Sequence, residues 1–158
     1  MKIGVPKEIK PQETRIGLTP DSVKDLVSNG HEVLVENKGG HEAGFENSHY
    51  ISAGAKIVDK AEDIFNDSEI IVKVKEPLLN EVKMIRENQI VFTYLHLAAA
   101  KELTQGLINS KGVCIAYETV TDQNGRLPLL APMSAVAGRM SVQAGAHCLE
   151  KNQKGRGF

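Results

Sequence analysis

The chain has 158 residues, of which 41% are hydrophobic and 25% are charged, so it is long enough for one ordinary core, and its composition excludes a disordered or fibrous protein. Its 19 Lys and Arg residues balance 20 Asp and Glu residues, which argues against a nucleic acid or an anionic membrane as a partner. The two cysteines, Cys114 and Cys148, lack metal or redox-pair spacing, and we expect neither a secretion signal nor a membrane span. These features predict a cytoplasmic protein.

Short apolar runs alternate with helical patterns along most of the chain. Residues 2–5 form a predicted strand that ends at Pro6, and a helix is predicted from a cap at Thr19 to a stop at Gly30. This alternation, at a spacing of about 20 to 25 residues, predicts a Rossmann-like (flavodoxin-like) α/β fold with a mostly parallel sheet and helices on both faces. The further predicted strands are 31–36, 56–58, 69–74, 90–95 and 112–117, with helical segments near 47–53 and 60–66, around Leu79, Val82 and Ile85, and through Leu103 and Leu107.

The last part of the chain has a different pattern. After a hairpin-like turn at 122–126, residues 132–150 predict one long connecting helix. The small residues Ala137, Ser141 and Gly145 recur every four positions, and they predict a flat stripe for close docking against another element. The chain stops soon after this helix, without an element that would close a core, so we expect a fragment of a longer protein.

Four polar residues follow predicted strands. Arg15 lies in the loop after the first strand, and Lys75, His96 and Glu118 each follow a later one. In an open parallel sheet the carboxyl ends of the strands line one crevice, so these residues predict a pocket for a small carboxylate with a carbonyl group. Plainer alternatives remain: a solvated loop arginine, a strand-end lysine reaching water, a structural histidine and a charge at the end of an element.

Other polar motifs give weaker evidence for a functional site. The glycine-rich loop at 39–44 matches neither a dinucleotide nor a P-loop pattern and is interpreted as a flexible turn. The remaining histidines show no metal spacing, so we predict no metal site; they are His31, His41, His49 and His147.

Six motifs together resemble one family along the chain, from the first residue to about Gly157. They are residues 1–10 (MKIGVPKEIK), 13–20 (ETRIGLTP), 74–77 (VKEP), 94–98 (YLHLA), 116–119 (AYET) and 129–139 (LLAPMSAVAGR). The sequence closely resembles the alanine dehydrogenases of the alanine dehydrogenase and pyridine nucleotide transhydrogenase family. The resemblance implies reversible oxidative deamination of L-alanine to pyruvate and ammonia with NAD, by a cytoplasmic homohexamer.

The resemblance also assigns roles to single residues. It implies that Arg15 holds the substrate carboxylate, that Lys75 binds the substrate and polarises its carbonyl or imine, and that His96 is the acid and base. Met133 would lie beside the substrate, and Ser134 would contact the nicotinamide cofactor. Residues 1–133 would then form an incomplete substrate-binding domain, and residues 134–158 a helix that leads toward an absent NAD-binding domain.

Two departures from the family pattern qualify these expectations. Ala135 stands where the family usually has a glutamate, and the Rossmann domain with its glycine-rich motif and catalytic aspartate is not in this sequence. We therefore expect the chain alone to be inactive. Two alternatives stay open: the nucleotide-binding subunit of a transhydrogenase, and a non-catalytic module that binds a small acid or other subunits.

Overall fold

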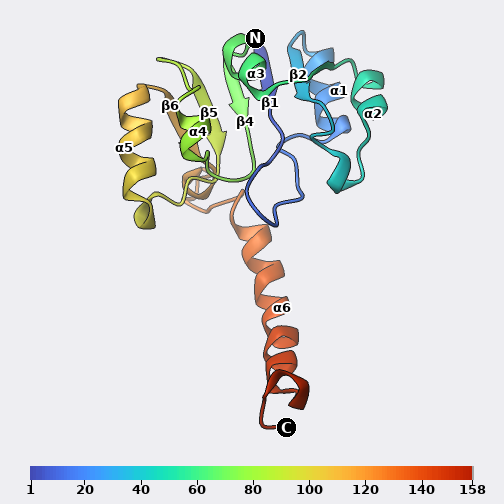
Figure 1. Cartoon of the computed structure of the whole chain (residues 1–158), viewed down its shortest axis with the longest axis vertical. Helices are drawn as coiled ribbons and strands as arrows, with labels where there is room; N and C mark the ends of the chain where they lie inside the picture. Colours follow the sequence, from blue (N-terminus) through green and yellow to red (C-terminus); the bar gives the residue numbers. More distant parts are fainter. Residues whose placement is uncertain (158) are drawn as a thin grey trace. The chain divides into compact units, whose positions relative to one another are not determined.

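The computed structural model describes residues 1–157 and divides into two compact units, Met1–Tyr117 and the segment that begins at Glu118. The first unit alternates strands and helices in chain order (Figure 1). Its elements are β1 (Lys2–Val5), α1 (Pro20–Ser28), β2 (Glu32–Glu36), η1 (His41–Ala43), α2 (Asn47–Ser52), β3 (Lys56–Val58), α3 (Ala61–Asp67), β4 (Ile70–Val72), α4 (Leu79–Val82), β5 (Ile90–Thr93), η2 (Leu97–Ala99), α5 (Lys101–Ser110) and β6 (Val113–Ala116).

The six strands form one sheet in the order β3-β2-β1-β4-β5-β6, and every neighbouring pair is parallel. Gly4 of β1 pairs with Leu34 of β2 on one side and with Ile71 of β4 on the other. The predicted Rossmann-like α/β fold is confirmed. The strand order, which the sequence left open, is that of dinucleotide-binding sheets rather than of flavodoxin, and it reverses direction between β1 and β4.

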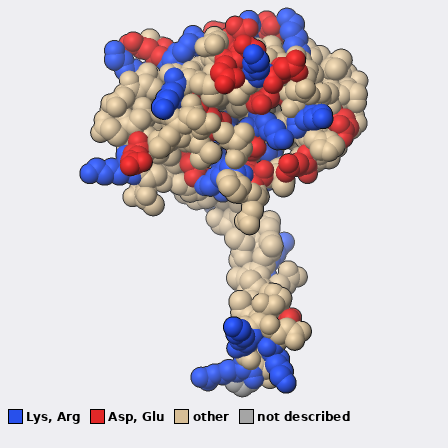
Figure 2. Space-filling model, viewed as in Figure 1, with Lys and Arg blue, Asp and Glu red and all other residues tan. Residues whose placement is uncertain are grey.

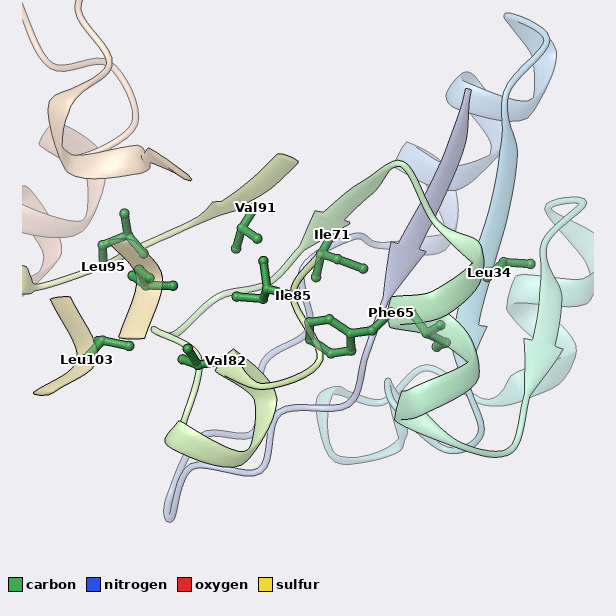
Figure 3. Close-up of a cluster of buried hydrophobic side chains, with 10 residues drawn as sticks. Leu34, Phe65, Ile71, Val82, Ile85, Val91, Leu95 and Leu103 are labelled. Carbon is green, nitrogen blue, oxygen red and sulfur yellow. The ribbon is translucent and has the colours of Figure 1, made fainter. Parts of the chain in front are cut away.

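Alternate residues of the strands enter two separate cores, one on each face of the sheet. In β2, Leu34 packs with α3, α4 and α5, whereas Val33 and Val35 pack on the side of α1 and α2. Figure 3 shows the first of these cores, in which Phe65, Ile71, Val82 and Val91 lie together. Helices therefore cover both faces, as expected of a parallel sheet.

A local signal explains where α1 begins. Thr19 caps α1, and its side chain accepts a hydrogen bond from the amide of Ser22, as the sequence predicted. Two predicted elements are shorter in the structure. The strand expected at 69–74 spans only Ile70–Val72, and beyond it the amide of Val74 donates to the side chain of Glu8. The helix expected around Leu79, Val82 and Ile85 is a single turn, α4, which ends at Val82.

The second unit contains α6 (Ala131–Leu149) and η4 (Lys151–Gln153), while η3 (Tyr117–Thr119) crosses the boundary between the units. The long helix predicted at 132–150 is confirmed, with Pro132 in its first turn, where a missing amide costs least. Its apolar side chains are exposed, among them Val136, Met140 and Val142.

Charges of both signs are interspersed over the first unit in the view of Figure 2. Within residues 1–157, no helix has the length and apolar character needed to cross a membrane.

Candidate functional site

The candidate site lies at the carboxyl edge of the sheet, where the strand order reverses between β1 and β4. The loop after β1 carries Arg15, and the segment after β4 carries Lys75. Such a reversal opens a crevice because the loops on its two sides lead in opposite directions. The structure therefore brings two of the predicted residues to the position where ligands bind in open α/β sheets.

Gly17 lets the Arg15 loop approach the end of β4 closely. A Cβ atom at Gly17 would lie 2.6 Å from the backbone oxygen of Val72 and 3.2 Å from the backbone nitrogen of Lys73. No side chain fits at such distances from a backbone that belongs to the sheet. The loop that carries Arg15 is thus docked directly on the strand that leads to Lys75.

The backbone of Lys75 is fixed on both sides by side chains. Its amide and that of Val74 donate to Oε1 of Glu8, over 3.3 and 2.6 Å. Its carbonyl accepts a 2.8 Å hydrogen bond from the hydroxyl of Thr93, which is completely buried. The backbone of Lys75, three residues beyond the end of β4, is therefore held by side chains on both sides.

A buried charge cluster, formed by Glu8, Lys73 and Glu81, lies in the same segments. The Lys73 ammonium is 3.2 Å from Glu8 and 2.9 Å from Glu81, and the three side chains are only 1%, 2% and 3% exposed for Lys73, Glu8 and Glu81. Glu81 also accepts a hydrogen bond from the amide of Leu78. The cluster ties the loop after β1 to β4 and α4, and carries one net negative charge.

Arg15 is held by a two-point ion pair with Glu13. Its Nε and terminal nitrogen donate to the two oxygens of Glu13 over 2.8 and 2.7 Å, and its backbone amide donates to the same carboxylate. The hydrogen bonds from Arg15 lower the pKa of Glu13 to about 2, against the opposing effect of burial, with a smaller contribution from the charge of Lys75. Hydrogen bonding to Glu13 likewise raises the pKa of Arg15. The guanidinium stays charged and oriented.

His96 has an unusual backbone conformation and lies three residues beyond the end of β5. Its φ and ψ are 49° and 38°, in the left-handed region, and it caps η2. Its ring stacks on Tyr94, with centroids 6.0 Å apart and planes inclined by 27°. A non-glycine residue in this conformation is uncommon and is often found at functional sites.

Glu76 is the nearest charged partner of His96. Its Oε2 lies 3.2 Å from Nδ1 of His96, and its Oε1 accepts a short hydrogen bond from the ammonium of Lys10. Burial works to raise the pKa of Glu76, but the hydrogen bonds from Lys10 and His96 outweigh it, so the net shift is downward. Glu76 therefore remains a carboxylate near neutral pH.

Electrostatic contacts connect the predicted residues of the first unit. The charge of Lys75 acts on Glu13, the partner of Arg15, and Arg15 itself interacts with Tyr94, which stacks on His96. Arg15 and Lys75 thus both act on Glu13, and Arg15 and His96 both interact with Tyr94. Two cations and an imidazole at one crevice suit a small carboxylate whose carbonyl or amine exchanges protons.

The other predicted site residues belong to the second unit. Met133 and Ser134 lie in the first turns of α6, and Glu118 lies in η3. The roles predicted for Met133 and Ser134 remain predictions.

Sequence reasoning missed the three carboxylates that orient the basic side chains: Glu8, Glu13 and Glu76. Glu13 is two residues from Arg15, and Glu76 lies between Lys75 and a proline, so their proximity in sequence was the available signal. Glu8 is 67 residues from Lys75, and only the strand order brings the two together.

The site is poorly suited to a dinucleotide, although the strand order is typical of dinucleotide-binding domains. The turn after β1 reads Pro6-Lys7-Glu8 and has no glycine-rich phosphate loop. Carboxylates take up backbone amides here: Glu36 accepts from the amide of Lys7 over 2.8 Å, and Glu8 from the end of β4. Burial raises the pKa of Glu36. Acidic side chains at these amides disfavour a pyrophosphate.

The whole chain is similar in sequence to known proteins. Residues 4–137 match the family described as alanine dehydrogenase/PNT, N-terminal domain. Over 158 residues, the chain is 54% identical to the alanine dehydrogenase of Halomonas elongata, covering all of this chain and 43% of that protein. It is also 54% identical to the alanine dehydrogenase of Bacillus subtilis over 159 residues, covering 41% of it. The chain spans less than half the length of these curated relatives.

Two solved structures extend the comparison. An L-alanine dehydrogenase, 54% identical, superposes with a TM-score of 0.91 over 99% of this chain and 43% of its own. A transhydrogenase from Sinorhizobium meliloti, 25% identical, superposes with a TM-score of 0.72 over 78% of this chain and 36% of its own.

Proposed function

The chain belongs to the alanine dehydrogenase/PNT N-terminal domain family, and we propose that it is the substrate-binding part of an alanine dehydrogenase. In the full-length protein, this part would hold L-alanine or pyruvate during reversible, NAD-dependent oxidative deamination. The observation that carries the proposal is the grouping of Arg15, Lys75 and His96 at the point where the sheet reverses its strand order.

Each side chain has a task that follows from its chemistry. Arg15, kept charged and oriented by Glu13, offers a planar cation that binds the substrate carboxylate. Lys75, whose backbone is held by Glu8 and Thr93, provides a compact positive charge that polarises the substrate carbonyl or imine. His96 accepts and returns protons as water adds to the imine and the resulting carbinolamine releases ammonia, work for which imidazole is suited near neutral pH.

NAD, when bound, supplies the acceptor for the hydride of the alanine α-carbon. We propose that Ser134, in the first turns of α6, contacts the cofactor and that Met133 lies beside the substrate. We also propose that residues 1–133 form an incomplete substrate-binding domain and residues 134–158 lead toward a cofactor domain. Val113 and Ile115 on β6 are 46% and 41% exposed, and this exposure supports the proposal that a further segment covers their face of β6.

The proposal extends to cellular context only through the relatives. A cytoplasmic, homohexameric enzyme is consistent with the near-neutral charge and with the exposed apolar side chains of α6. A transhydrogenase subunit is the less favoured candidate, because transfer between two nicotinamides needs no carboxylate-binding Arg15 and Lys75. The similarity to the transhydrogenase is also lower, at 25% identity against 54%.

Alanine-dependent reduction of NAD by the full-length protein tests the proposal. We expect Lys75→Ala and His96→Ala to lose about 10²-fold or more in kcat/KM, as is usual when a proton-transfer or charge-stabilising group is removed. Lys111→Ala is the matched control, because Lys111 forms only an exposed 3.5 Å pair with Glu87. Full activity of both site variants would overturn the assignment.

Calorimetry on the 158-residue chain separates the alternatives. We expect pyruvate to bind, Arg15→Ala to weaken that binding, and alanine not to be oxidised. Binding of NADH with no binding of pyruvate would favour the transhydrogenase-like candidate.

A further inference from the structure

The structure contains a carboxylate that the proposed chemistry does not yet use. Glu76 contacts the Nδ1 atom of His96 with one oxygen and the ammonium of Lys10 with the other. Its side chain is 16% exposed, whereas that of His96 is 54% exposed, so the carboxylate is the better fixed of the two. Pro77 follows directly and restricts the backbone of Glu76 to extended conformations.

We propose that Glu76 is a positioning residue that fixes the orientation and the tautomer of His96, and that Lys10 in turn fixes Glu76. The proposal rests on the proposed function, because it gives His96 a proton-transfer role. A carboxylate can only accept hydrogen bonds, so the contact requires the proton of the neutral imidazole to sit on Nδ1. Nε2 then becomes the nitrogen that accepts the substrate's proton.

The surroundings of His96 support a fixed ring. Tyr94 stacks on one side of the imidazole, and the left-handed backbone of His96 leads straight into η2. The charged groups near the ring include Glu76, after β4, and, behind it, Lys10, in the loop after β1. Both belong to the segments that flank the reversal of strand order and carry Lys75 and Arg15. The two substrate cations and the histidine are therefore aligned by the same pair of loops.

Glu76→Gln gives a sharp test because the amide has one donor and one acceptor end. Lys10 can bond only to the amide oxygen, so the amide nitrogen is directed at Nδ1 of His96 and donates to it. The proton of the neutral ring must then move to Nε2, which removes the accepting nitrogen from the reaction. In the full-length protein we expect kcat to fall by about 10²- to 10⁴-fold, with KM for alanine changed by less than about threefold.

The double variant Lys10→Met/Glu76→Gln distinguishes positioning from a merely structural role. Without Lys10, the amide can rotate and present its oxygen to Nδ1, so the double variant should recover at least about tenfold in kcat over Glu76→Gln. Lys10→Met alone keeps the carboxylate and should lose less than about fivefold. Glu87→Gln, which makes the same chemical change at the exposed pair with Lys111, is the control.

Nitrogen-15 NMR of the His96 ring in the 158-residue chain, at about pH 8.5 where imidazoles are mostly neutral, reads the tautomer without any activity. We expect the proton on Nδ1 in the parent chain, on Nε2 in Glu76→Gln, and again on Nδ1 in the double variant. An unchanged tautomer in Glu76→Gln overturns the proposal. If the full-length protein fails to oxidise alanine, the proposed function fails, and the NMR result alone decides the positioning role.

Discussion

The same types of side chain form two kinds of acid–base cluster at the carboxyl edge of the sheet. The buried cluster of Glu8, Lys73 and Glu81 is at most 3% exposed. In the rim pairs, Arg15 with Glu13 and His96 with Glu76, the basic side chains are 49% and 54% exposed, whereas the carboxylates are 6% and 16% exposed. The buried cluster joins the loop after β1 to the segment after β4, and the pair of His96 with Glu76 joins the segments after β5 and β4.

The buried cluster and the rim pairs differ in how much hydration their charged groups have lost. Charges in the buried cluster have given up water, so each depends on its partner, and removal of one is costly. At the rim, the basic side chains of Arg15 and His96 are about half exposed, so they keep much of their hydration, add little to stability and remain accessible to a small substrate. The buried cluster therefore holds the site in shape, while the rim pairs orient the groups that act on the ligand.

Lys73→Met tests whether the buried cluster contributes more to stability than an exposed ion pair does. It leaves Glu8 and Glu81 buried with no cation between them, and we expect a loss of about 3–5 kcal/mol in the free energy of unfolding, measured by urea denaturation. Lys111→Met, in an exposed pair, should cost no more than about 0.5 kcal/mol. Equal midpoints for these two variants would show that burial does not separate the clusters.

Gly17→Ala tests whether the Arg15 loop must lie on β4. The new methyl group would meet the backbone oxygen of Val72 at 2.6 Å, so the loop must move, at a cost of about 1–3 kcal/mol. Because Arg15 moves with it, we expect pyruvate binding to weaken in calorimetry. Gly138→Ala in α6 meets no atom within 4 Å and should be neutral or stabilising, since alanine is the better helix former. Unaltered pyruvate binding in Gly17→Ala would contradict the role of this contact.

Much of the framework followed from local patterns in the sequence. Apolar periodicity located all six strands, the Thr19 cap located α1, and the parallel sheet placed Arg15, Lys75 and His96 at one edge. These features depend on neighbouring residues or on a general rule of parallel sheets. The fold class and the basic side chains of the site were therefore predictable.

The carboxylates of the site were not predictable in the same way. The contacts of Glu8 with Val74 and of Glu76 with His96 join residues 66 and 20 positions apart, and no periodicity encodes them. The predicted strand at 69–74 was too long: β4 ends at Val72, two residues before the amide that donates to Glu8. Long-range polar pairs need the strand order, and the sequence left that order open.

Thr93→Val tests the hydrogen bond that holds the backbone of Lys75, and its expected effect is smaller. The buried hydroxyl of Thr93 donates to the Lys75 carbonyl over 2.8 Å, and valine has the same shape without the donor. We expect a loss of about 1–2 kcal/mol in stability, because the carbonyl loses a buried partner. Thr93→Ser keeps the hydroxyl and should retain more of the pyruvate affinity than Thr93→Val does. The reverse order of affinities would assign the effect to packing rather than to the hydrogen bond.

The smallest expected effect concerns Glu13 and appears only in acid. The hydrogen bonds from Arg15 lower its pKa from 4.5 to about 2, so the folded state prefers the carboxylate more strongly than the unfolded state does. The resulting stabilisation is fully present above pH 4.5 and is lost as the pH falls toward 2. Because Arg15 is half exposed and the pair is screened by water, we expect a stabilisation of only about 1 kcal/mol.

The difference in unfolding free energy between the parent chain and Glu13→Gln should therefore shrink between pH 5 and pH 2.5, as measured by urea denaturation at each pH. A constant difference across that range would mean that the rim pair contributes through packing and not through its charges.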